Sequence, residues 1–393
     1  MTAILTINSG SSSLKFAEFQ IGPPLHRSWH GQISRIGQGN GQIRITTETG
    51  DIVTEESHSF DRQADALTWL FQWWKTHTGM DAPAAIGHRV VHGGTQFTEP
   101  ERVSPDFLQA LKTLQPLAPD HLPPEIRAME LIEEQLPNVP QIACFDTAFH
   151  RSIPPVAQRL PLLRTLAKGN LRRYGFHGLS YAYLLQQLRE LEPELVAGRW
   201  IFCHLGNGSS LAAVKAGQCV ETTMGMTPLG GLMMGSRPGE IDPGVILHLL
   251  RSEPLDPDGL AEILQHHSGL KGVSGISSDM AELLALEATE AHAAEAVALF
   301  VYTAKKAIGA LAAVLDGIDG IVFTGGIGEN SPIIRERILD GLAYLGVMLD
   351  ATRNHGQAAV LSPEGHRPVI RRIVANEEAI IAQQTAEKLG LIS

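Results

Sequence analysis

The chain has 393 residues, more than one ordinary hydrophobic core accommodates, so we expect two domains. Hydrophobic residues make up 44% of the sequence and charged residues 19%, which excludes an intrinsically disordered chain. The formal net charge of −11 argues against nucleic acid as a partner, because phosphate neutralisation requires a basic surface.

The sequence favours a cytoplasmic protein without a membrane partner. Its three cysteines share no metal-ligand spacing, so we expect buried free thiols in a reducing compartment. The N-terminus lacks the basic segment of a signal peptide. The apolar stretch Ala293–Leu315 contains Lys305 and Lys306 and falls short of a clean membrane span.

The first residues predict a β-hairpin with an open loop. The apolar run Ile4–Ile7 is followed by the polar turn Asn8–Ser13 and a second apolar run, Leu14–Phe19. A loop without bulky side chains lets backbone N–H groups approach phosphate oxygens, and Lys15 adds a positive charge beside it. For one such loop, an ordinary turn is the simpler interpretation.

Helices and strands then alternate, which predicts an α/β architecture. A helix over Asp61–His77 places Ala64, Leu67, Phe71 and Trp74 on one stripe. Further helices are expected to open at Ser104-Pro105 and Ser331-Pro332 and to cover Glu295–Leu315 and Asn376–Lys388. Strands are expected at Ala85–Val91, Gln141–Phe145, Gly320–Thr324 and Val369–Val374.

The hairpin pattern returns in the second half of the chain. Trp200–Leu205 leads into the Gly/Ser turn Gly206–Ser210 and the apolar run Leu211–Val214. This repeat suggests a duplicated domain with one phosphate-facing hairpin in each half. Two matching loops favour phosphate binding over ordinary turns.

Nucleotide binding, if present, requires a loop other than the common ones. No Gly is followed by Lys, so there is no Walker-A motif, and no G-x-G-x-x-G fingerprint follows a strand. The segment Gly325–Pro332 follows an expected strand and opens a helix, where backbone amides could hold a nucleotide. The alternative is a tight strand-to-helix connection.

Charged side chains lie at the ends of two of the expected strands. Arg89 ends one strand beside two glycines, and arginine binds a carboxylate or phosphate in bidentate fashion. Asp146 directly follows another strand, where α/β proteins keep catalytic groups. His88 and His92 have no third ligand nearby, which favours structural histidines over a metal site. Arg237 lies among Gly, Met and Pro residues, unlike a solvated surface charge.

Two further segments are candidates. His177 is flanked by glycines in an expected exposed turn. Glu377 and Glu378 begin the last helix, where acidic residues also complement the helix dipole.

These segments together resemble the acetate kinase family, within the acetate and sugar kinase, heat-shock chaperone and actin superfamily. They occur in the order of the family and span nearly the whole chain. The segments are Asn8–Lys15, Gly87–Gly94, Phe145–His150, Arg173–Gly178, His204–Ser210, Met224–Pro243, Gly325–Asn330 and Asn376–Glu378.

The resemblance implies two ribonuclease-H-like (actin-like ATPase) domains facing a central cleft, usually in a homodimer. The first would cover residues 1–148, with the helix at 378–393 packing back on it, and the second residues 149–377. The implied reaction is reversible in-line transfer of the ATP γ-phosphoryl group to acetate, giving acetyl phosphate and ADP, with Mg²⁺ or Mn²⁺. A carboxylate is already ionised at neutral pH, so this chemistry needs no strong base.

The resemblance also implies a function for individual residues. Asp146, His177 and Arg237 would be catalytic, and Asn8 and Glu377 would face the metal. The small carboxylate would contact Arg89, Val91, Phe176 and Pro228. The nucleotide would contact Lys15, His204, Leu205, Gly206, Asn207, Gly208, Asp279, Met280, Ala281, Gly326, Ile327, Gly328, Glu329 and Asn330.

Four positions depart from the family pattern. Asp120 replaces an apolar residue of the acyl pocket, which keeps a propionate, butyrate or other short-chain acyl kinase as an alternative. Ala281 replaces a usual Arg, which leaves the base preference of the nucleotide open. Tyr181 replaces a His and Gly230 a Glu. A non-catalytic nucleotide-binding module is a remote alternative. It would predict the loss of Arg89, Arg237, Asp146 or His177, and all four are present.

Overall fold

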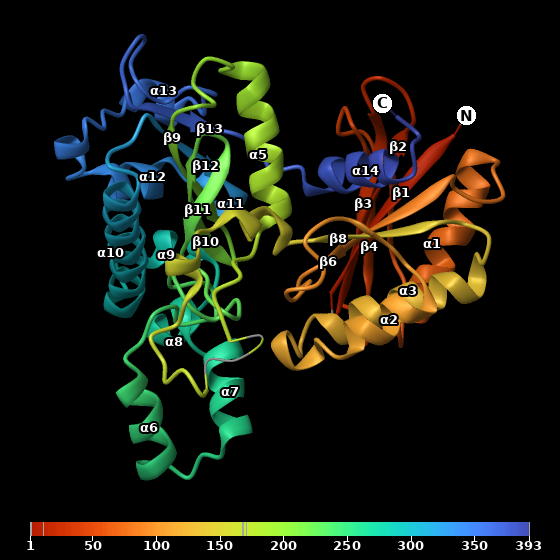
Figure 1. The fold of residues 1–393 in the computed structure, drawn as a ribbon, viewed down its shortest axis with the longest axis horizontal. Coiled ribbons are helices and arrows are strands. Elements are labelled where there is room, and N and C mark those ends of the chain that lie inside the picture. The colour runs from red at the N-terminus through yellow and green to blue at the C-terminus, as the bar shows by residue number, and fades with distance from the viewer. Residues whose placement is uncertain (1, 11, 167–168, 170, 393) are drawn as a thin grey trace. The chain divides into compact units, whose positions relative to one another are not determined.

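The computed structural model describes residues 2–10, 12–166, 169 and 171–392, and the chain divides into two compact units. Unit 1 comprises Met1–Phe149 together with Asn376–Ser393, and unit 2 comprises His150–Ala375. Each unit has a β-sheet of its own with helices packed against it (Figure 1).

The sheet of unit 1 has eight strands in the order β5-β4-β3-β2-β1-β6-β8-β7. Strand β1 pairs antiparallel with β2 and parallel with β6, which pairs parallel with β8. The carboxyl ends of β1, β6 and β8 therefore lie at one edge of the sheet. The strands are β1 (Ala3–Ser9), β2 (Ser13–Gln20), β3 (His26–Ser34), β4 (Gln42–Thr47), β5 (Ile52–Ser57), β6 (Ala85–Val90), β7 (Glu101–Arg102) and β8 (Gln141–Phe145).

Helices cover both faces of this sheet (Figure 1). They are α1 (Gln63–Thr78), α2 (Pro105–Lys112), α3 (Leu122–Gln135) and α14 (Glu377–Lys388). Leu5 and Ile7 of β1 face a core that includes residues of α1 and α3, whereas Ile4 packs with Ala382 and Ala386 of α14. This alternation follows from the two-residue period of a strand. The last helix of the chain thus completes the unit formed by the first residues.

The helix predicted over Asp61–His77 is confirmed as α1, but its buried face differs from the predicted stripe. Leu67 and Trp74 are buried as predicted, whereas Ala64 and Phe71 are only partly buried. The buried face instead includes Trp73, whose ring packs edge-on against Trp29 at 5.0 Å between centroids. The large indole group shifts the buried face because the sheet offers it an aromatic partner.

The sheet of unit 2 has five strands in the order β11-β10-β9-β12-β13. Its antiparallel and parallel pairs repeat the pattern of β3-β2-β1-β6-β8 in unit 1. The duplication predicted from the two Gly/Ser hairpins is therefore confirmed, as is the α/β class with two ribonuclease-H-like sheets. The strands are β9 (Arg199–Leu205), β10 (Ser209–Lys215), β11 (Gln218–Thr222), β12 (Gly320–Thr324) and β13 (Val369–Arg372).

Two helices pack against opposite faces of this sheet (Figure 1). On α5, Tyr181 packs near Phe202 of β9, whereas Phe300 and Ile308 of α10 join Ile201 in the other core. The remaining helices connect the strands or extend from the sheet. The helices of unit 2 are α4 (Pro155–Gln158), α5 (Gly178–Leu191), α6 (Pro243–Ser252), α7 (Pro257–His266), α8 (Gly269–Ser274), α9 (Met280–Leu286), α10 (Ala291–Val314), α11 (Gly325–Asn330), α12 (Pro332–Leu339) and α13 (Ala351–His355).

Helix α10 begins at Ala291, four residues before the predicted start. Among the described residues it is the one helix long and apolar enough to cross a membrane by length and composition. That criterion is weak, because a core helix also meets it. One side of α10 packs in the core of unit 2, as expected of a core helix.

Candidate active site

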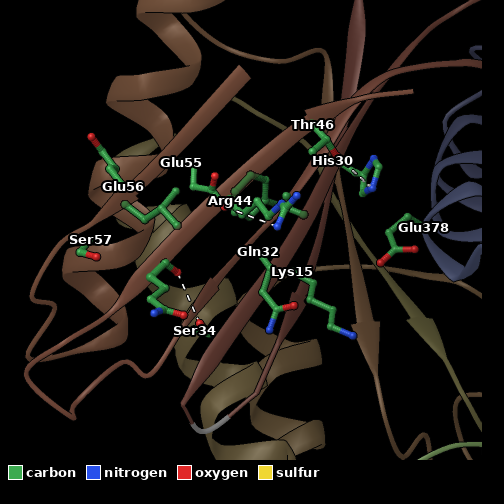
Figure 2. Close-up of a pocket in the computed structure, with 14 residues that line it drawn as sticks. Lys15, His30, Gln32, Ser34, Arg44, Thr46, Glu55, Glu56, Ser57 and Glu378 are labelled. Atoms are coloured by element: carbon green, nitrogen blue, oxygen red, sulfur yellow. Dashed lines mark hydrogen bonds and ion pairs between the residues drawn. The ribbon is translucent and has the colours of Figure 1, made fainter. Parts of the chain in front are cut away.

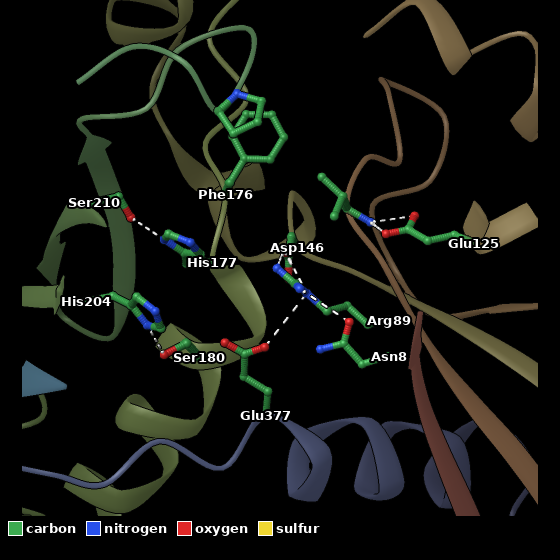
Figure 3. Close-up of polar contacts among 12 residues, drawn as sticks. Asn8, Arg89, Glu125, Asp146, Phe176, His177, Ser180, His204, Ser210 and Glu377 are labelled. Atoms are coloured by element: carbon green, nitrogen blue, oxygen red, sulfur yellow. Dashed lines mark hydrogen bonds and ion pairs between the residues drawn. The ribbon is translucent and has the colours of Figure 1, made fainter. Parts of the chain in front are cut away.

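Four polar side chains of unit 1 converge at the edge formed by the carboxyl ends of its parallel strands. Arg89 lies near the end of β6, Asn8 near the end of β1, Asp146 directly after β8, and Glu377 on the first turn of α14. Figure 3 shows Asn8, Asp146 and Glu377 around the Arg89 guanidinium group. The parallel pairing of β1, β6 and β8 brings three of these residues together, and α14 adds the fourth.

Arg89 is the centre of this cluster. Its Nη2 donates to Oδ2 of Asp146 at 2.6 Å, and its Nη1 donates to Oδ1 of Asn8 at 3.4 Å. Its Nε lies 3.7 Å from Oε2 of Glu377. The Asp146 side chain is 1% exposed, so this is a buried ion pair with an oxygen-rich surrounding.

Burial and charge act in opposite directions on these groups. Burial lowers the pKa of Arg89, but the carboxylates of Asp146 and Glu377 outweigh it and hold that pKa above its ordinary value. Burial raises the pKa of Glu377, and Arg89 opposes this rise. The guanidinium group therefore stays charged, and its charge opposes the effect of burial on Glu377.

Glu125 supports the end of β6, and no local sequence pattern indicates this contact. Its carboxyl oxygens accept from the backbone N–H of Val91 at 3.1 and 3.3 Å. The side chain is buried, which raises the pKa of Glu125 well above its ordinary value, and the charge of Arg89 opposes this rise. Glu125 lies on the first turn of α3, where an acidic residue usually only complements the helix dipole.

Lys15 lies on the polar face of the sheet rather than inside the cluster. It pairs across β1 and β2 with Asn8, and it lines a pocket of about 710 Å³ over β2–β5 (Figure 2). Burial raises the pKa of Glu377, and the charge of Lys15, like that of Arg89, opposes this rise. The in-register neighbours of Lys15 on the next three strands are Gln32, Arg44 and Glu55.

The histidines of the Gly87–Gly94 segment each make a hydrogen bond within unit 1. Nε2 of His88 contacts Oε1 of Gln141 at 2.8 Å, and Nδ1 of His92 accepts from the backbone N–H of Gly94 at 2.9 Å. Burial lowers the pKa of His88 to about 4. In the part of the chain that the structure describes, no group of three or more His, Cys, Asp or Glu residues forms a metal site.

His177 occupies a special backbone position in unit 2. It precedes α5 with a φ of 58°, in the left-handed region that non-glycine residues rarely adopt. Phe176 before it is buried, and its carbonyl oxygen accepts from Nε2 of His150 at 2.9 Å. The turn predicted to be exposed is therefore largely buried, because Tyr174, Gly175 and Phe176 pack inside the unit.

The ring of His177 is held by its neighbours. Its Nδ1 lies 2.9 Å from Oγ of Ser210, and its ring stacks on His204 at 4.2 Å between centroids. His204 in turn contacts Ser180 through Nδ1 at 2.9 Å (Figure 3). Ser210 was not selected from the sequence, although it ends the Gly206–Ser210 turn.

Arg237 lies beside the β9–β10 loop. Its Nη1 donates to the carbonyl oxygen of Pro228 at 2.8 Å. A Cβ placed on Gly208 would lie 2.9 Å from Nη2 of Arg237 and 3.2 Å from Nε2 of His177. Arg237 and His177 thus meet at Gly208, where any side chain would displace them.

The second glycine segment adjoins the same loop. Gly325 has a φ of 78°, and a Cβ there would lie 2.7 Å from the carbonyl oxygen of Leu205. A Cβ on Gly206 would lie 3.7 Å from the backbone nitrogen of Gly326. The amides of α11 and those of the β9–β10 loop therefore border one surface.

Some side chains of the implied nucleotide set have internal partners. Oε1 of Glu329 accepts from the N–H groups of Gly325 and Ala375 at 2.8 and 2.9 Å. Asp279 caps α9 by accepting from Glu282, and Met280 is buried in the core, whereas Ala281 is exposed. At Met280, contact with a nucleotide would therefore fall to the backbone, whereas Asp279 and Ala281 are exposed.

The residues that depart from the pattern of the acetate kinase family have distinct environments. Asp120 is exposed in the turn before α3, so no buried carboxylate has to be neutralised there. Gly230 lines a groove with Gly231. Tyr181 is fully buried and reaches Ser210. The three cysteines are buried and free, as predicted.

The chain matches known proteins along nearly its whole length. The model of the acetokinase family matches residues 3–383. An acetate kinase of Methylocella silvestris is 42% identical, covering 97% of this chain and 96% of that protein. The crystal structure of an acetate kinase from Porphyromonas gingivalis has a TM-score of 0.89 at 32% identity, covering 99% and 100%. That of a propionate kinase from Francisella tularensis has a TM-score of 0.93 at 33% identity, covering 98% and 100%.

Proposed function

The chain belongs to the acetokinase family, and from this premise we propose that it transfers the γ-phosphoryl group of ATP to acetate, giving acetyl phosphate and ADP. The observation that carries the proposal is the convergence of Asn8, Arg89, Asp146 and Glu377 on one sheet edge. An anionic acceptor needs a fixed cation to approach a triphosphate, and Arg89 supplies one.

Arg89 is proposed to hold the acetate carboxylate. A guanidinium group has five N–H donors, and its contacts to Asp146 and Asn8 leave donors for a second carboxylate. Because Asp146 fixes the plane of the guanidinium group, the acetate oxygen is oriented before transfer. Val91, which directly follows β6, donates from its backbone N–H to Glu125 and is proposed to border the methyl group.

The oxygen atoms around Arg89 are of the kind that Mg²⁺ prefers as ligands. They do not include three or more His, Cys, Asp or Glu side chains grouped as a metal site, and no such group occurs among the described positions. Mg²⁺ usually binds proteins through one or two carboxylates and takes its other ligands from water and phosphate. We propose that Asn8 and Glu377 hold it, with Asp146 beside them. When bound, Mg²⁺ neutralises charge on the phosphate oxygens.

In unit 2, Arg237 and His177 are proposed to stabilise charge on the transferred phosphoryl group. Both lie at Gly208, whose missing side chain leaves room for an oxygen atom. The amides of the β9–β10 loop and of Gly326–Asn330 are proposed to bind the phosphates and the nucleoside.

Acetate is favoured over a larger or more polar acid by the position of Asp120. Its carboxylate is exposed, so the departure from the family pattern does not place a charge in the buried part of unit 1. The propionate kinase of similar structure keeps a short-chain acyl kinase as the second candidate.

The test is a hydroxylamine-trapping assay for acyl phosphate with Mg²⁺, ATP and a parallel series of acetate, propionate, butyrate and a hydroxy-substituted acid. A preference for acetate is expected. A preference for propionate or butyrate would replace the acetate assignment and keep the acyl kinase. No product from any acid, with ATP bound, would contradict the enzyme and favour a nucleotide-binding module.

A homodimer is proposed from an apolar surface of unit 2. Helix α6 has no buried residue, although it carries several apolar side chains. Two of them, Val245 and Leu247, are 44% and 51% exposed. Ile246 of the same helix lines a groove of about 630 Å³ with Leu264 and Leu311. Exposed apolar patches of this kind mark interaction sites.

Light scattering should therefore give twice the chain mass for the wild-type protein. Leu247→Asp should lower it, whereas Leu191→Asp, at a similarly exposed leucine on α5, should not. A monomeric wild-type protein would contradict the dimer.

A further inference from the structure

The ring of His177 is held by contacts with Ser210 and His204, and its backbone is strained. Its φ of 58° costs free energy that the surrounding structure must offset. Nδ1 faces Ser210 and Nε2 faces Gly208, so the two ring nitrogens have different surroundings. The nitrogen that carries the proton decides whether His177 presents an N–H donor or a lone pair at Gly208.

Tyr181 lies one helical turn after His177 and meets the same serine. Its backbone N–H donates to the carbonyl oxygen of His177 at 3.0 Å, and its hydroxyl group lies 2.5 Å from Oγ of Ser210. The side chain is fully buried, and burial raises the pKa of Tyr181 well above its ordinary value. The hydroxyl group therefore keeps its proton, and Ser210 lies between two side chains that both contact its oxygen.

We propose that Tyr181 is a positioning residue that fixes the tautomer of His177 through Ser210. The Tyr181 hydroxyl group donates to Oγ of Ser210, and the Ser210 hydroxyl group donates to Nδ1 of His177. The imidazole proton is thereby kept on Nε2, which faces Gly208. This inference rests on the proposed function of His177 as a hydrogen-bond donor to the transferred phosphoryl group.

The direction of these two hydrogen bonds, from Tyr181 to Ser210 and from Ser210 to His177, has a chemical consequence. With Nδ1 as acceptor, Nε2–H donates to a phosphoryl oxygen as negative charge develops there. With the opposite tautomer, the lone pair of Nε2 would face that oxygen and repel it. Stacking on His204 keeps the ring plane fixed in either case, so the tautomer is the property that Tyr181 controls.

The test compares Tyr181→Phe and Ser210→Ala with the wild-type protein and with Tyr344→Phe, a control at a 73% exposed tyrosine. The tautomer is read from the ¹⁵N shifts of the imidazole, assigned by comparison with His177→Gln. Turnover and KM are measured with Mg²⁺, ATP and acetate.

The wild-type protein should show the Nε2–H tautomer. Both relay variants should show mixed tautomers and a kcat lower by about tenfold, less than the about 10²–10³-fold loss on removing a direct transition-state contact. KM for both substrates should stay unchanged, because neither residue touches them, and Tyr344→Phe should behave as wild type.

An Nδ1–H tautomer in the wild-type protein would overturn the proposal. The proposal would also be overturned if Tyr181→Phe kept the tautomer and the kcat of the wild-type protein. If Tyr181→Phe fails to fold, Ser210→Ala decides, because it interrupts the same chain with a smaller change. The absence of any acyl phosphate would contradict the proposed function instead, and the tautomer spectrum would still decide the hydrogen-bond direction.

Discussion

Removing the charge of Arg89 should affect stability and catalysis in separable ways. Arg89→Met leaves Asp146 without its 2.6 Å partner while its side chain is 1% exposed. Removing one member of a buried ion pair costs about 3–5 kcal/mol, because the remaining charge is uncompensated. Glu377 loses a partner too, so its pKa should rise further.

Tryptophan fluorescence during urea unfolding suits this measurement. Four of the five tryptophans, Trp29, Trp69, Trp73 and Trp74, lie in unit 1, as Arg89 does. The double variant Arg89→Met/Asp146→Asn is the matched control, because it removes both charges. It should recover most of the lost free energy of unfolding, since replacing both partners can be nearly neutral.

The catalytic consequence is measured with acetate as the varied substrate. A hydrogen bond to a charged group contributes about 1.5–3 kcal/mol, which corresponds to a loss of about 10–100-fold in kcat/KM for acetate. The loss should appear in KM for acetate, with KM for ATP unchanged. A raised KM for ATP with an unchanged KM for acetate would refute the assignment and place Arg89 with the nucleotide.

Three further predictions concern other parts of the site and the fold. Arg237→Ala should lower kcat by about 10²–10³-fold while the nucleotide Kd, measured by calorimetry, stays the same, and an unchanged kcat would contradict its function. Chelation of divalent cations should abolish turnover and Mg²⁺ or Mn²⁺ should restore it, whereas Glu377→Gln should raise the Mg²⁺ concentration needed for half-maximal activity. His88 should contribute stability that is complete above pH 6.5 and is lost as the pH falls towards 4, because only the unfolded chain takes up its proton in that range. His88→Gln should therefore remove up to about 1.4 kcal/mol per pH unit from the slope of wild-type unfolding free energy, and equal slopes would contradict the burial effect.

Much of the fold was predictable because local patterns encode it. The hairpins at Ile4–Phe19 and Trp200–Val214 follow from apolar runs separated by Gly/Ser turns, and the structure confirms both. Ser104 and Ser331 cap α2 and α12 as their position before Pro predicts. Each of these features depends on neighbouring residues in the chain, so no tertiary information is needed.

Half of the unit 1 cluster could also be located from the sequence. Arg89 lies near the end of one predicted strand and Asp146 directly follows another. The two strands pair in parallel, which brings their carboxyl ends to one edge. The position of Glu377 was implied only by resemblance. Its place in the chain, at the start of the last helix, gives a local reason for an acid there without indicating Arg89.

The tertiary structure alone decided what surrounds these groups. Glu125 and Tyr181 look like an ordinary helix-start acid and an ordinary helical tyrosine, yet packing places one against Val91 and the other against Ser210. The sequence determined which segments form strands and helices, because hydrogen-bonding and propensity act over a few residues. The partners of a buried polar group depend on how distant elements pack, and that packing has no local signature.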